Sequence, residues 1–252
     1  MKRRSFVSIM LSAPLCQIGS VYAQSNELVV GVDTSFMPFE FKQGEKYVGF
    51  DVDIWDAVAT AQGWKYRLQP LDFPAIIPAL QTKNIDAAMC GMVIKPARQK
   101  VIDFSSPYYD SGLAIAVQDN NVNITKPEDL TGKTVGALTG SSAISWLKDS
   151  VKDVHIQQFP VIDQVYLALV AGRVDAVVHD TPNVQYFANT AGKGQIKIVA
   201  HPVTGDKYGF AFPKGSPLVE KFDREFKKMV SDGRYITINK KWFGPEAVGV
   251  AS

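Results

Sequence analysis

The sequence predicts an α/β fold made of two similar lobes with a ligand cleft between them. Strand-like and helix-like segments alternate along the chain, which is typical of parallel α/β sheets. A helix–turn–strand pattern also occurs twice. The first copy is Ala79-Leu80, followed after four intervening residues by Ile85-Asp86-Ala87. The second copy is Ala168-Leu169, followed after four intervening residues by Val174-Asp175-Ala176. Chance similarity between common turns is the alternative. The 252 residues are 46% apolar and 21% charged, a globular composition that can form two cores.

The first 23 residues have the features of a secretory signal peptide. Three basic residues at positions 2–4 precede a short apolar run, and a Val-Tyr-Ala site ends at Ala23. The run is shorter than the about 20 residues of a membrane span. Cleavage near Ala23 would leave 229 residues in the periplasm and change the net charge from +2 to −1. A lipoprotein anchor at Cys16 is less favoured, because Leu15 precedes it instead of a small residue.

Cleavage would leave Cys90 as the only cysteine of the mature chain. The fold must then be stabilised by its core, without an internal disulfide. Cys90 lies in an apolar run, which predicts buried packing. A reactive thiol is the alternative, but it would need an activating base that the sequence does not indicate.

The first half of the mature chain is predicted to form three strands and two helices. Apolar residues at 50, 54, 55, 57, 58 and 61 follow a helical stripe, and short apolar runs between turn residues indicate strands. In chain order these elements are strand 28–33, helix 50–62, strand 66–68, helix 74–82 and strand 85–89.

The second half repeats this alternation. The same patterns predict, in chain order, strand 133–138, helix 141–148, strand 156–159, helix 164–171, strand 174–178 and helix 181–189. Residues 216–242 are predicted to form one or two amphipathic helices, interrupted at Gly233.

Polar or exposed residues stand at the ends of two corresponding strands. Cys90-Gly91 follows the repeated pattern in the first half, and His179-Asp180 follows it in the second. Ligands of open α/β sheets bind beyond the carboxyl ends of the strands. Two such ends that face one another would form a cleft between lobes, where small-molecule sites are common.

Most templates for enzymes and for nucleic-acid binding are missing from the sequence. There is no G-x-S-x-G, Walker A or G-x-G-x-x-G motif, and the three histidines lack the i, i+4 spacing of a zinc helix. Basic residues are scattered without an aromatic-interleaved stripe. The sequence therefore predicts no cofactor, no metal and no nucleic-acid partner.

The remaining polar residues near the strand ends suit an amino acid. The planar Arg98 side chain matches a carboxylate, and Gly140-Ser141-Ser142 opens a helix whose free N–H groups bind anions. Asp180 could bind an ammonium group. Each residue also has a structural alternative: Arg98 as a surface charge, and Ser141 and Asp180 as helix caps. Their joint placement at strand ends favours the ligand site.

An ordered series of motifs spans the whole mature chain. In chain order it reads LVVGVDTSFMPFEF at 28–41, YVGFDVD at 47–53, DF at 72–73, IIPAL at 76–80, Arg98, IDFS at 102–105, YY at 108–109, HDTPN at 179–183 and WFG at 242–244. This series resembles the periplasmic solute-binding proteins for polar amino acids, family 3 of the bacterial extracellular solute-binding proteins. Within that family it is most similar to the glutamine-binding members of ABC importers.

The resemblance implies a type II periplasmic-binding-protein fold, in which two lobes close on one ligand like a Venus flytrap. The first lobe would comprise residues 24–108 and 209–252, and the second residues 113–203. The hinges would lie near 109–112 and 204–208. The implied partners are a small-molecule amino acid and the membrane permease subunits of an ABC importer, and the protein would be a monomer.

The resemblance also implies roles for individual residues. Asp33 would contact the ligand side chain, and Phe36 and Phe73 would enclose its aliphatic part. The ammonium group would bind Asp180 and the carbonyl of Gly91, and the carboxylate would bind Arg98. The other expected ligand-binding residues are Cys90, Val93, Leu138, Ser141, Ser142 and His179, with the backbone N–H of Ser142 assisting at the carboxylate.

Two positions depart from the glutamine-binding pattern. Leu138 stands where those proteins have a lysine directed at the ligand side chain, and Val93 stands where the family usually has threonine. Leu138 cannot donate to a side-chain amide, and an unmade buried hydrogen bond costs about 1–3 kcal/mol. Glutamine would then bind roughly 5–150-fold more weakly unless Ser141, Thr139 or water substitutes. A polar or less polar amino acid is therefore expected, with glutamine as one candidate.

Two other functions fit the same fold. Cyclohexadienyl or arogenate dehydratases are similar in architecture, and an enzyme of that kind would need an acid–base pair such as His179 with Asp33. The sensor lobe of a receptor is the third possibility, although the sequence shows no attached signalling domain. Binding without turnover is the preferred expectation, because the aromatic pair and the Arg98 and Asp180 contacts are explained by binding.

Overall fold

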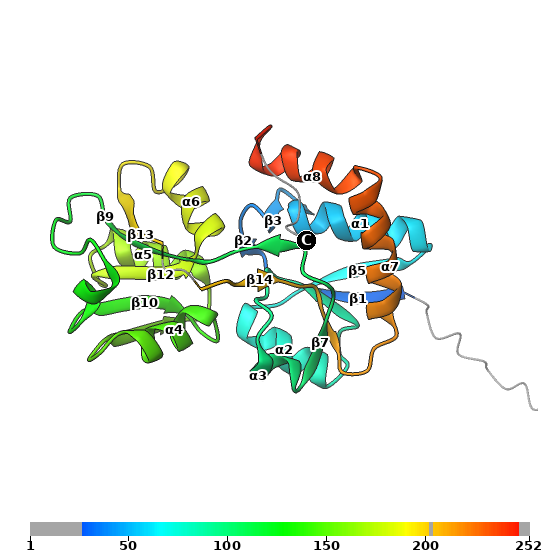
Figure 1. Cartoon of the computed structure of the whole chain (residues 1–252), viewed down its shortest axis with the longest axis horizontal. Helices are drawn as coiled ribbons and strands as arrows, with labels where there is room; N and C mark the ends of the chain where they lie inside the picture. Colours follow the sequence, from blue (N-terminus) through cyan, green and yellow to red (C-terminus); the bar gives the residue numbers. More distant parts are fainter. Residues whose placement is uncertain (1–26, 202–203, 247–252) are drawn as a thin grey trace, which may run out of the picture.

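The computed structural model describes residues 27–201 and 204–246, and it has two α/β lobes that lie side by side (Figure 1). One lobe contains the beginning and the end of the described chain, and the other contains its middle. The expected signal peptide and Cys16 lie outside the described residues. Within the described ranges, no helix is long and apolar enough to cross a membrane.

The first lobe is built on a five-stranded sheet. Its strand order is β5 (Lys65–Pro70), β1 (Glu27–Val32), β6 (Ala87–Met89), β15 (Ala211–Pro213) and β7 (Ile102–Phe104). A small sheet of β2 (Ser35–Phe36), β3 (Glu40–Gln43) and β4 (Lys46–Val48) follows β1. The helices are α1 (Phe50–Gln62), α2 (Phe73–Gln81), α3 (Pro96–Gln99), α7 (Leu218–Ser231) and α8 (Arg234–Phe243). Gly233 separates α7 from α8, at the predicted interruption.

The second lobe has a sheet of the same size. Its strand order is β11 (His155–Phe159), β10 (Thr134–Leu138), β12 (Ala176–Asp180), β9 (Leu113–Gln118) and β13 (Ile196–Ala200). Its helices are α4 (Ser142–Ser150), α5 (Ile162–Val170) and α6 (Thr181–Asn189), together with the 3-10 turn η1 (Pro127–Leu130). The α/β class and the two-lobed architecture expected from the sequence are confirmed.

The sheets are mixed, whereas the alternation of strands and helices indicated parallel sheets. β9 runs antiparallel to both of its neighbours, β12 and β13, in the second sheet, and β15 runs antiparallel to β6 and β7 in the first. The direction of β9 follows from where the chain enters the second lobe. β9 begins at Leu113, opposite Asp180, the last residue of β12, so it starts at the edge where the other strands end.

Two short strands carry the chain between the lobes. β8 (Tyr109–Asp110) leads from the first lobe to the second, and β14 (Lys207–Tyr208) leads back. They pair antiparallel, with Lys207 opposite Asp110 and Tyr208 opposite Tyr109. We call β8 and β14 the crossing strands. They lie within the predicted hinges, although hinge motion and the proposed lobe boundaries stay predictions.

The repeated sequence pattern forms equivalent hydrogen bonds in the two lobes. Oδ2 of Asp86 accepts from the backbone N–H of Val29 at 2.7 Å, and Oδ2 of Asp175 accepts from that of Thr134 at 2.8 Å. Val29 lies on β1 and Thr134 begins β10. Each aspartate therefore ties the turn before its own strand to the neighbouring parallel strand, which explains why the pattern occurs twice.

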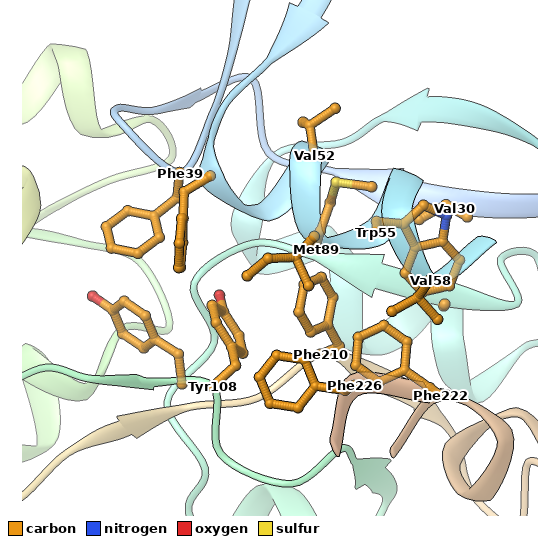
Figure 2. Packing of buried hydrophobic residues seen from close by; sticks show 14 of the residues in the cluster. Val30, Phe39, Val52, Trp55, Val58, Met89, Tyr108, Phe210, Phe222 and Phe226 are labelled. Atoms are coloured by element: carbon orange, nitrogen blue, oxygen red, sulfur yellow. The ribbon is translucent and has the colours of Figure 1, made fainter. Parts of the chain in front are cut away.

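An aromatic core stabilises the first lobe. Trp55 from α1 stacks on Phe222 from α7 with ring centroids 5.7 Å apart, and Phe210 packs on Phe222 at 4.7 Å (Figure 2). Another apolar cluster includes Phe73 and Ile76 of the first lobe together with Leu138 and Val165 of the second. Because this cluster spans the cleft, the lobes are closed on one another in the structure.

Candidate functional site

The ends of several strands from both lobes meet at one small buried cavity. Its volume is about 10 Å³, close to the space that one water molecule occupies. The first lobe contributes the segment after β6, and the second contributes the ends of β10 and β12. The lining residues are Phe36, Phe73, Cys90, Gly91, Val93, Arg98, Leu138, Ser141, Ser142, His179 and Asp180. The structure thus brings together all of the sequence-predicted site residues except Asp33.

Arg98 bridges the two lobes at the edge of this cavity. Nη1 donates to the carbonyl of Val93 at 2.7 Å, and Nη2 donates across the cleft to the carbonyl of Gly140 at 2.8 Å. The guanidinium carbon also lies 5.5 Å from the centroid of Phe73. Burial lowers the pKa of Arg98, and the negative charge of Asp180 opposes this effect. The guanidinium is therefore a desolvated cation, which suits an anionic group.

The first turn of α4 faces the cavity beside Arg98. Ser141 is the residue before the helix and Ser142 begins it, and both side chains are buried with no hydrogen-bond partner for their hydroxyl groups among the residues that the structure describes. The backbone N–H groups at a helix start lack partners within the helix, and they favour negative charge. Arg98 and the start of α4 therefore make one end of the cavity positive.

Asp180 provides the opposite charge. It ends β12, is almost fully buried, and accepts a hydrogen bond of 2.8 Å from the hydroxyl of Tyr208. Burial raises its pKa to about 7, while the Tyr208 hydroxyl and the charges of Arg98 and Lys95 lower it. Oδ1 of Asp180 has no hydrogen-bond donor in the described part of the chain. A cationic group beside it would recover part of the cost of burying this carboxylate.

His179 and the two phenylalanines form apolar walls. The His179 ring meets Phe36 edge to face at 5.7 Å, and burial lowers the pKa of the imidazole to about 3. His179 is therefore neutral at physiological pH. Phe36 packs against Gly91, which has a φ of +51°, and a Cβ at that position would lie only 2.1 Å from the Phe36 ring. A side chain at Gly91 would therefore displace Phe36.

Three of the predicted residues contribute mainly apolar surface. Leu138 ends β10 and is 2% exposed, and Val93 follows Gly91 in the buried segment after β6. The thiol of Cys90 is free and buried, as the sequence predicted. Burial raises the pKa of this thiol well above its usual range, and the charge of Asp33 adds to the effect. Cys90 is therefore an unreactive part of the wall.

Asp33 lies close to the site but does not line the cavity. It follows β1, is 7% exposed, and accepts a hydrogen bond of 3.1 Å from the backbone N–H of Ser35. Burial raises the pKa of Asp33 to about 6, and the charges of Asp72 and Asp163 raise it further. Three carboxyl groups, those of Asp33, Asp72 and Asp163, are therefore close enough to interact electrostatically beside the cavity.

Sequence reasoning missed three residues that support the site. Nζ of Lys95 contacts Oδ1 of the buried Asp206 at 2.5 Å, beside the crossing strand β14. Tyr208 on that strand holds Asp180. None of these residues lies in a recognisable motif, because their roles arise from the return of the chain between the lobes. The one available signal was the position of Asp206 and Tyr208 within the predicted hinge.

A larger groove lies beside the crossing strands. Its volume is about 690 Å³, and its lining includes Tyr109, Tyr186, His201, Trp242 and Phe243. Asp110 also borders it but is paired with Lys207 at 2.7 Å. The smaller cavity, with Arg98 and Asp180 at its edges, has the charges that an amino acid requires. In the described ranges, no group of three or more histidine, cysteine or acidic residues could hold a metal ion.

Comparisons with known proteins agree with this geometry. The family model of bacterial extracellular solute-binding proteins, family 3, matches residues 28–245. The arginine-binding extracellular protein ArtP of Bacillus subtilis is 30% identical over 87% of this chain and 87% of its own length. An ancestral arginine-binding protein, solved with arginine, has a TM-score of 0.82 and 40% identity over 87% of this chain and 99% of that chain.

Two further solved structures bear on specificity and on enzyme activity. The same kind of ancestral protein was solved bound to glutamine, with a TM-score of 0.81 and 40% identity over 87% of this chain and 98% of that chain. An ancestral amino-acid-binding protein described as a precursor of cyclohexadienyl dehydratase has a TM-score of 0.80 and 35% identity, covering 86% of this chain and 96% of that chain. Both resemble this chain over nearly their whole length.

Proposed function

Because the chain belongs to family 3 of the bacterial extracellular solute-binding proteins, we propose that it binds one L-amino acid between its lobes and delivers it to the permease of an ABC importer. The observation that carries this proposal is the placement of Arg98 and Asp180 around one cavity. Arg98 and the start of α4 would bind the ligand carboxylate, and Asp180 would bind its ammonium group. Export through the signal peptide, with cleavage near Ala23, would place the protein in the periplasm.

Ligand entry requires the lobes to separate. A cavity of about 10 Å³ is far smaller than an amino acid. Two hydrogen bonds between the lobes would have to break: Arg98 Nη2 to Gly140 and Asn183 Nδ2 to the carbonyl of Met37, at 2.8 and 2.7 Å. The ligand would then favour closure only through contacts that both lobes make with it.

We further propose that the preferred ligand has a cationic side chain. Asp33 is buried, and the nearby charges of Asp72 and Asp163 raise its pKa, so a cation in this region would relieve an unfavourable arrangement of carboxylates. Leu138 offers no hydrogen bond to a side-chain amide, which disfavours glutamine. Relatives named as arginine-binding proteins support this choice. Glutamine is the second candidate.

Titration calorimetry with a panel of amino acids tests this proposal. The panel should contain L-arginine, L-lysine, L-histidine, L-glutamine and L-glutamate, with D-arginine as the control for stereochemistry. We expect L-arginine or L-lysine to bind most tightly and to raise the unfolding temperature by mass action. Tightest binding of L-glutamine would refute the cationic preference only. Absence of binding to every L-amino acid would refute the proposed site.

A dehydratase is the second candidate function. A pKa of about 7 for Asp180 is suitable for a general acid or base, and one similar ancestral structure is described as a precursor of cyclohexadienyl dehydratase. His179 supports this function poorly, because an imidazole with a pKa of about 3 is a weak base. Incubation with arogenate, followed by mass spectrometry, separates the two functions: a binding protein returns its ligand unchanged.

A further inference from the structure

Two fully buried carboxyl groups lie behind the ligand cavity. Glu40 begins β3 and Asp51 lies in the first turn of α1, and both have an exposed fraction of 0%. Each carboxyl group influences the pKa of the other, so the two groups are close neighbours. Three of their four oxygens, both from Glu40 and Oδ1 of Asp51, have no hydrogen-bond partner among the described residues.

The backbone holds these two groups together. The N–H of Phe50 donates to the carbonyl of Pro38 at 3.0 Å, and the N–H of Asp51 donates to that of Phe39 at 2.9 Å. Gly49 makes this close approach possible, because a Cβ at its φ of 146° would lie 1.9 Å from the Phe39 carbonyl oxygen. The backbone segments that carry Glu40 and Asp51 are therefore held next to one another.

The surroundings make one negative charge much more favourable than two. Asp51 and Asp33 both oppose ionisation of Glu40, as does the thiol of Cys90 if it ionises. Burial raises the pKa of Glu40 well above its usual range and that of Asp51 to about 6. Two adjacent carboxylates in an apolar environment cannot both ionise at low cost.

The charge is favoured on Asp51. Its Oδ2 accepts a hydrogen bond of 2.6 Å from the hydroxyl of Tyr108, and the helix start stabilises an anion there. The backbone N–H of Gly91 also lowers the pKa of Asp51. Within the described ranges Glu40 has no comparable donor, which favours the proton on Glu40.

We propose that Glu40 is protonated at neutral pH and donates a hydrogen bond to Asp51, and that this singly charged Glu40–Asp51 pair positions the walls of the ligand cavity. Glu40 pairs with Phe36 in the β2–β3 ladder, and Asp51 faces the backbone of Gly91. Phe36 and Gly91 pack against one another in the cavity wall. Glu40 and Asp51 are thus positioning residues. The assignment of the proton to Glu40 does not depend on which ligand the protein binds, whereas the effect of the pair on ligand binding rests on the proposed function.

A comparison of the wild type with Glu40→Gln tests the proton assignment through stability. The glutamine amide can donate to Asp51 as the protonated glutamate does, but it cannot lose a proton. A raised pKa means that the folded protein retains a proton which the unfolded chain releases near pH 4.5. As the pH rises above 4.5, the unfolding equilibrium constant of the wild type should increase relative to that of Glu40→Gln by up to about tenfold per pH unit.

Several other ionisable groups lie near the pair, and their contributions to the pH dependence of stability cancel when the two proteins are compared. Asp33, Cys90, Tyr108 and Tyr235 surround Asp51 and Glu40, and both variants retain them. The exposed Glu45, in the turn after β3, gives the matched control Glu45→Gln, which should show no pH-dependent difference. A stability difference between the wild type and Glu40→Gln that is the same from pH 4.5 to 8.5 would overturn the assignment.

Infrared spectroscopy of the wild type gives a second test that needs no variant to fold. With glutamate labelled by ¹³C at the carboxyl carbon, a protonated-carboxyl band at pH 7.5 should shift with the label. Such a band would confirm that a glutamate is protonated, and its absence would refute the proposal. The band should also be lost in Glu40→Gln.

Titration with L-arginine tests the positioning role. We expect Glu40→Gln to bind within about twofold of the wild type, and Glu40→Ala to bind about 5–150-fold more weakly, because it loses a buried hydrogen bond of about 1–3 kcal/mol. Equal affinity of all three proteins would refute the positioning role. If the wild type fails to bind L-arginine but shows the pH-dependent stability, the proposed ligand is wrong and the proton assignment stands.

Discussion

The hydroxyl of Tyr208 donates a hydrogen bond of 2.8 Å to Oδ2 of Asp180 and so connects a crossing strand to the ligand cavity. Tyr208 lies on β14, which returns the chain to the first lobe, whereas Asp180 ends β12 in the second lobe. Both side chains are buried. Movement of β14 relative to β12 must therefore change the environment of Asp180.

Removal of this hydroxyl in Tyr208→Phe should weaken binding of the ligand by about tenfold at pH 7. The hydroxyl lowers the pKa of Asp180 from the value that burial alone would impose, so its loss leaves more Asp180 protonated and unable to bind an ammonium group. Calorimetry at pH 7.0 and 8.5 checks this expectation, and affinity should partly recover at the higher pH. Tyr109→Phe is the control, because the Tyr109 ring stacks on Tyr208 but makes no hydrogen bond with Asp180 within the described ranges. Equal losses in both variants would contradict the prediction.

Affinity of the wild type should fall as the pH drops below 7. The pKa of Asp180 is raised to about 7, so below that pH the site must release a proton before it binds an ammonium group. The expected loss is up to about tenfold per pH unit, with little change above pH 7.5. Asp180→Asn should bind weakly and show a much smaller dependence in the same titrations. A wild-type affinity that is constant from pH 5.5 to 8 would exclude Asp180 as the ammonium partner.

Closure should depend on Asp180 more than on contacts from a single lobe. We expect Asp180→Ala to lower affinity and also to prevent full compaction with ligand, because the second lobe would lose the bond proposed between Asp180 and the ammonium group. Phe73→Leu in the first lobe should chiefly lower affinity. Small-angle scattering at saturating ligand measures the radius of gyration of both variants. A fully compact Asp180→Ala complex would be inconsistent with this role.

Much of the fold followed from sequence periodicity. Helices α1 and α6 begin and end at the predicted residues, because each has an amphipathic pattern between clear boundaries. The antiparallel strands β9 and β15 were not predicted. Their apolar runs resemble buried parallel strands, and only the passage of the chain between lobes sets their direction.

The site residues that come shortly after a strand in the sequence could be predicted. The sequence placed Arg98 and Asp180 near strand ends, and both line the observed cavity. Tyr208 and the Lys95–Asp206 contact could not be predicted, since they join residues more than 25 positions apart through tertiary packing. The position of Asp33 behind the cavity likewise depends on how the lobes meet.

Replacement of Leu138 by lysine should change the ligand preference. Leu138→Lys adds a donor for a side-chain amide and a positive charge in the cleft, so we expect the ranking to shift toward glutamine and away from cationic amino acids. The gain for glutamine should be about 5–150-fold, the value of one buried hydrogen bond. Calorimetric titration of both proteins with the amino-acid panel measures it, and Leu138→Met controls for the change of shape. An unchanged ranking would rule out position 138 as a determinant of specificity.

The planar geometry of the Arg98 guanidinium should contribute to ligand affinity in addition to its charge. Its two terminal nitrogens bond carbonyl groups of Val93 and Gly140 in different lobes, a geometry that lysine cannot reproduce. Arg98→Lys should therefore bind the ligand at least about tenfold more weakly, since a hydrogen bond to a charged group contributes about 1.5–3 kcal/mol. Calorimetry beside the exposed control Arg67→Lys tests this. Equal affinity of Arg98→Lys and the wild type would show that charge alone suffices.

Acid sensitivity of the fold should be traceable to His179. Burial lowers the pKa of this imidazole from 6.5 to about 3, so the unfolded chain binds a proton between these values and the folded protein does not. Stability from this group is therefore present above pH 6.5 and is lost as the pH falls toward 3, by up to about 1.4 kcal/mol per pH unit. His179→Gln should remove that dependence, although the variant is less stable at pH 7. Urea unfolding between pH 4 and 7, with the exposed His155→Gln as control, measures the difference. Parallel stability curves for the wild type and His179→Gln would mean that the pKa of His179 is the same in the folded and unfolded protein.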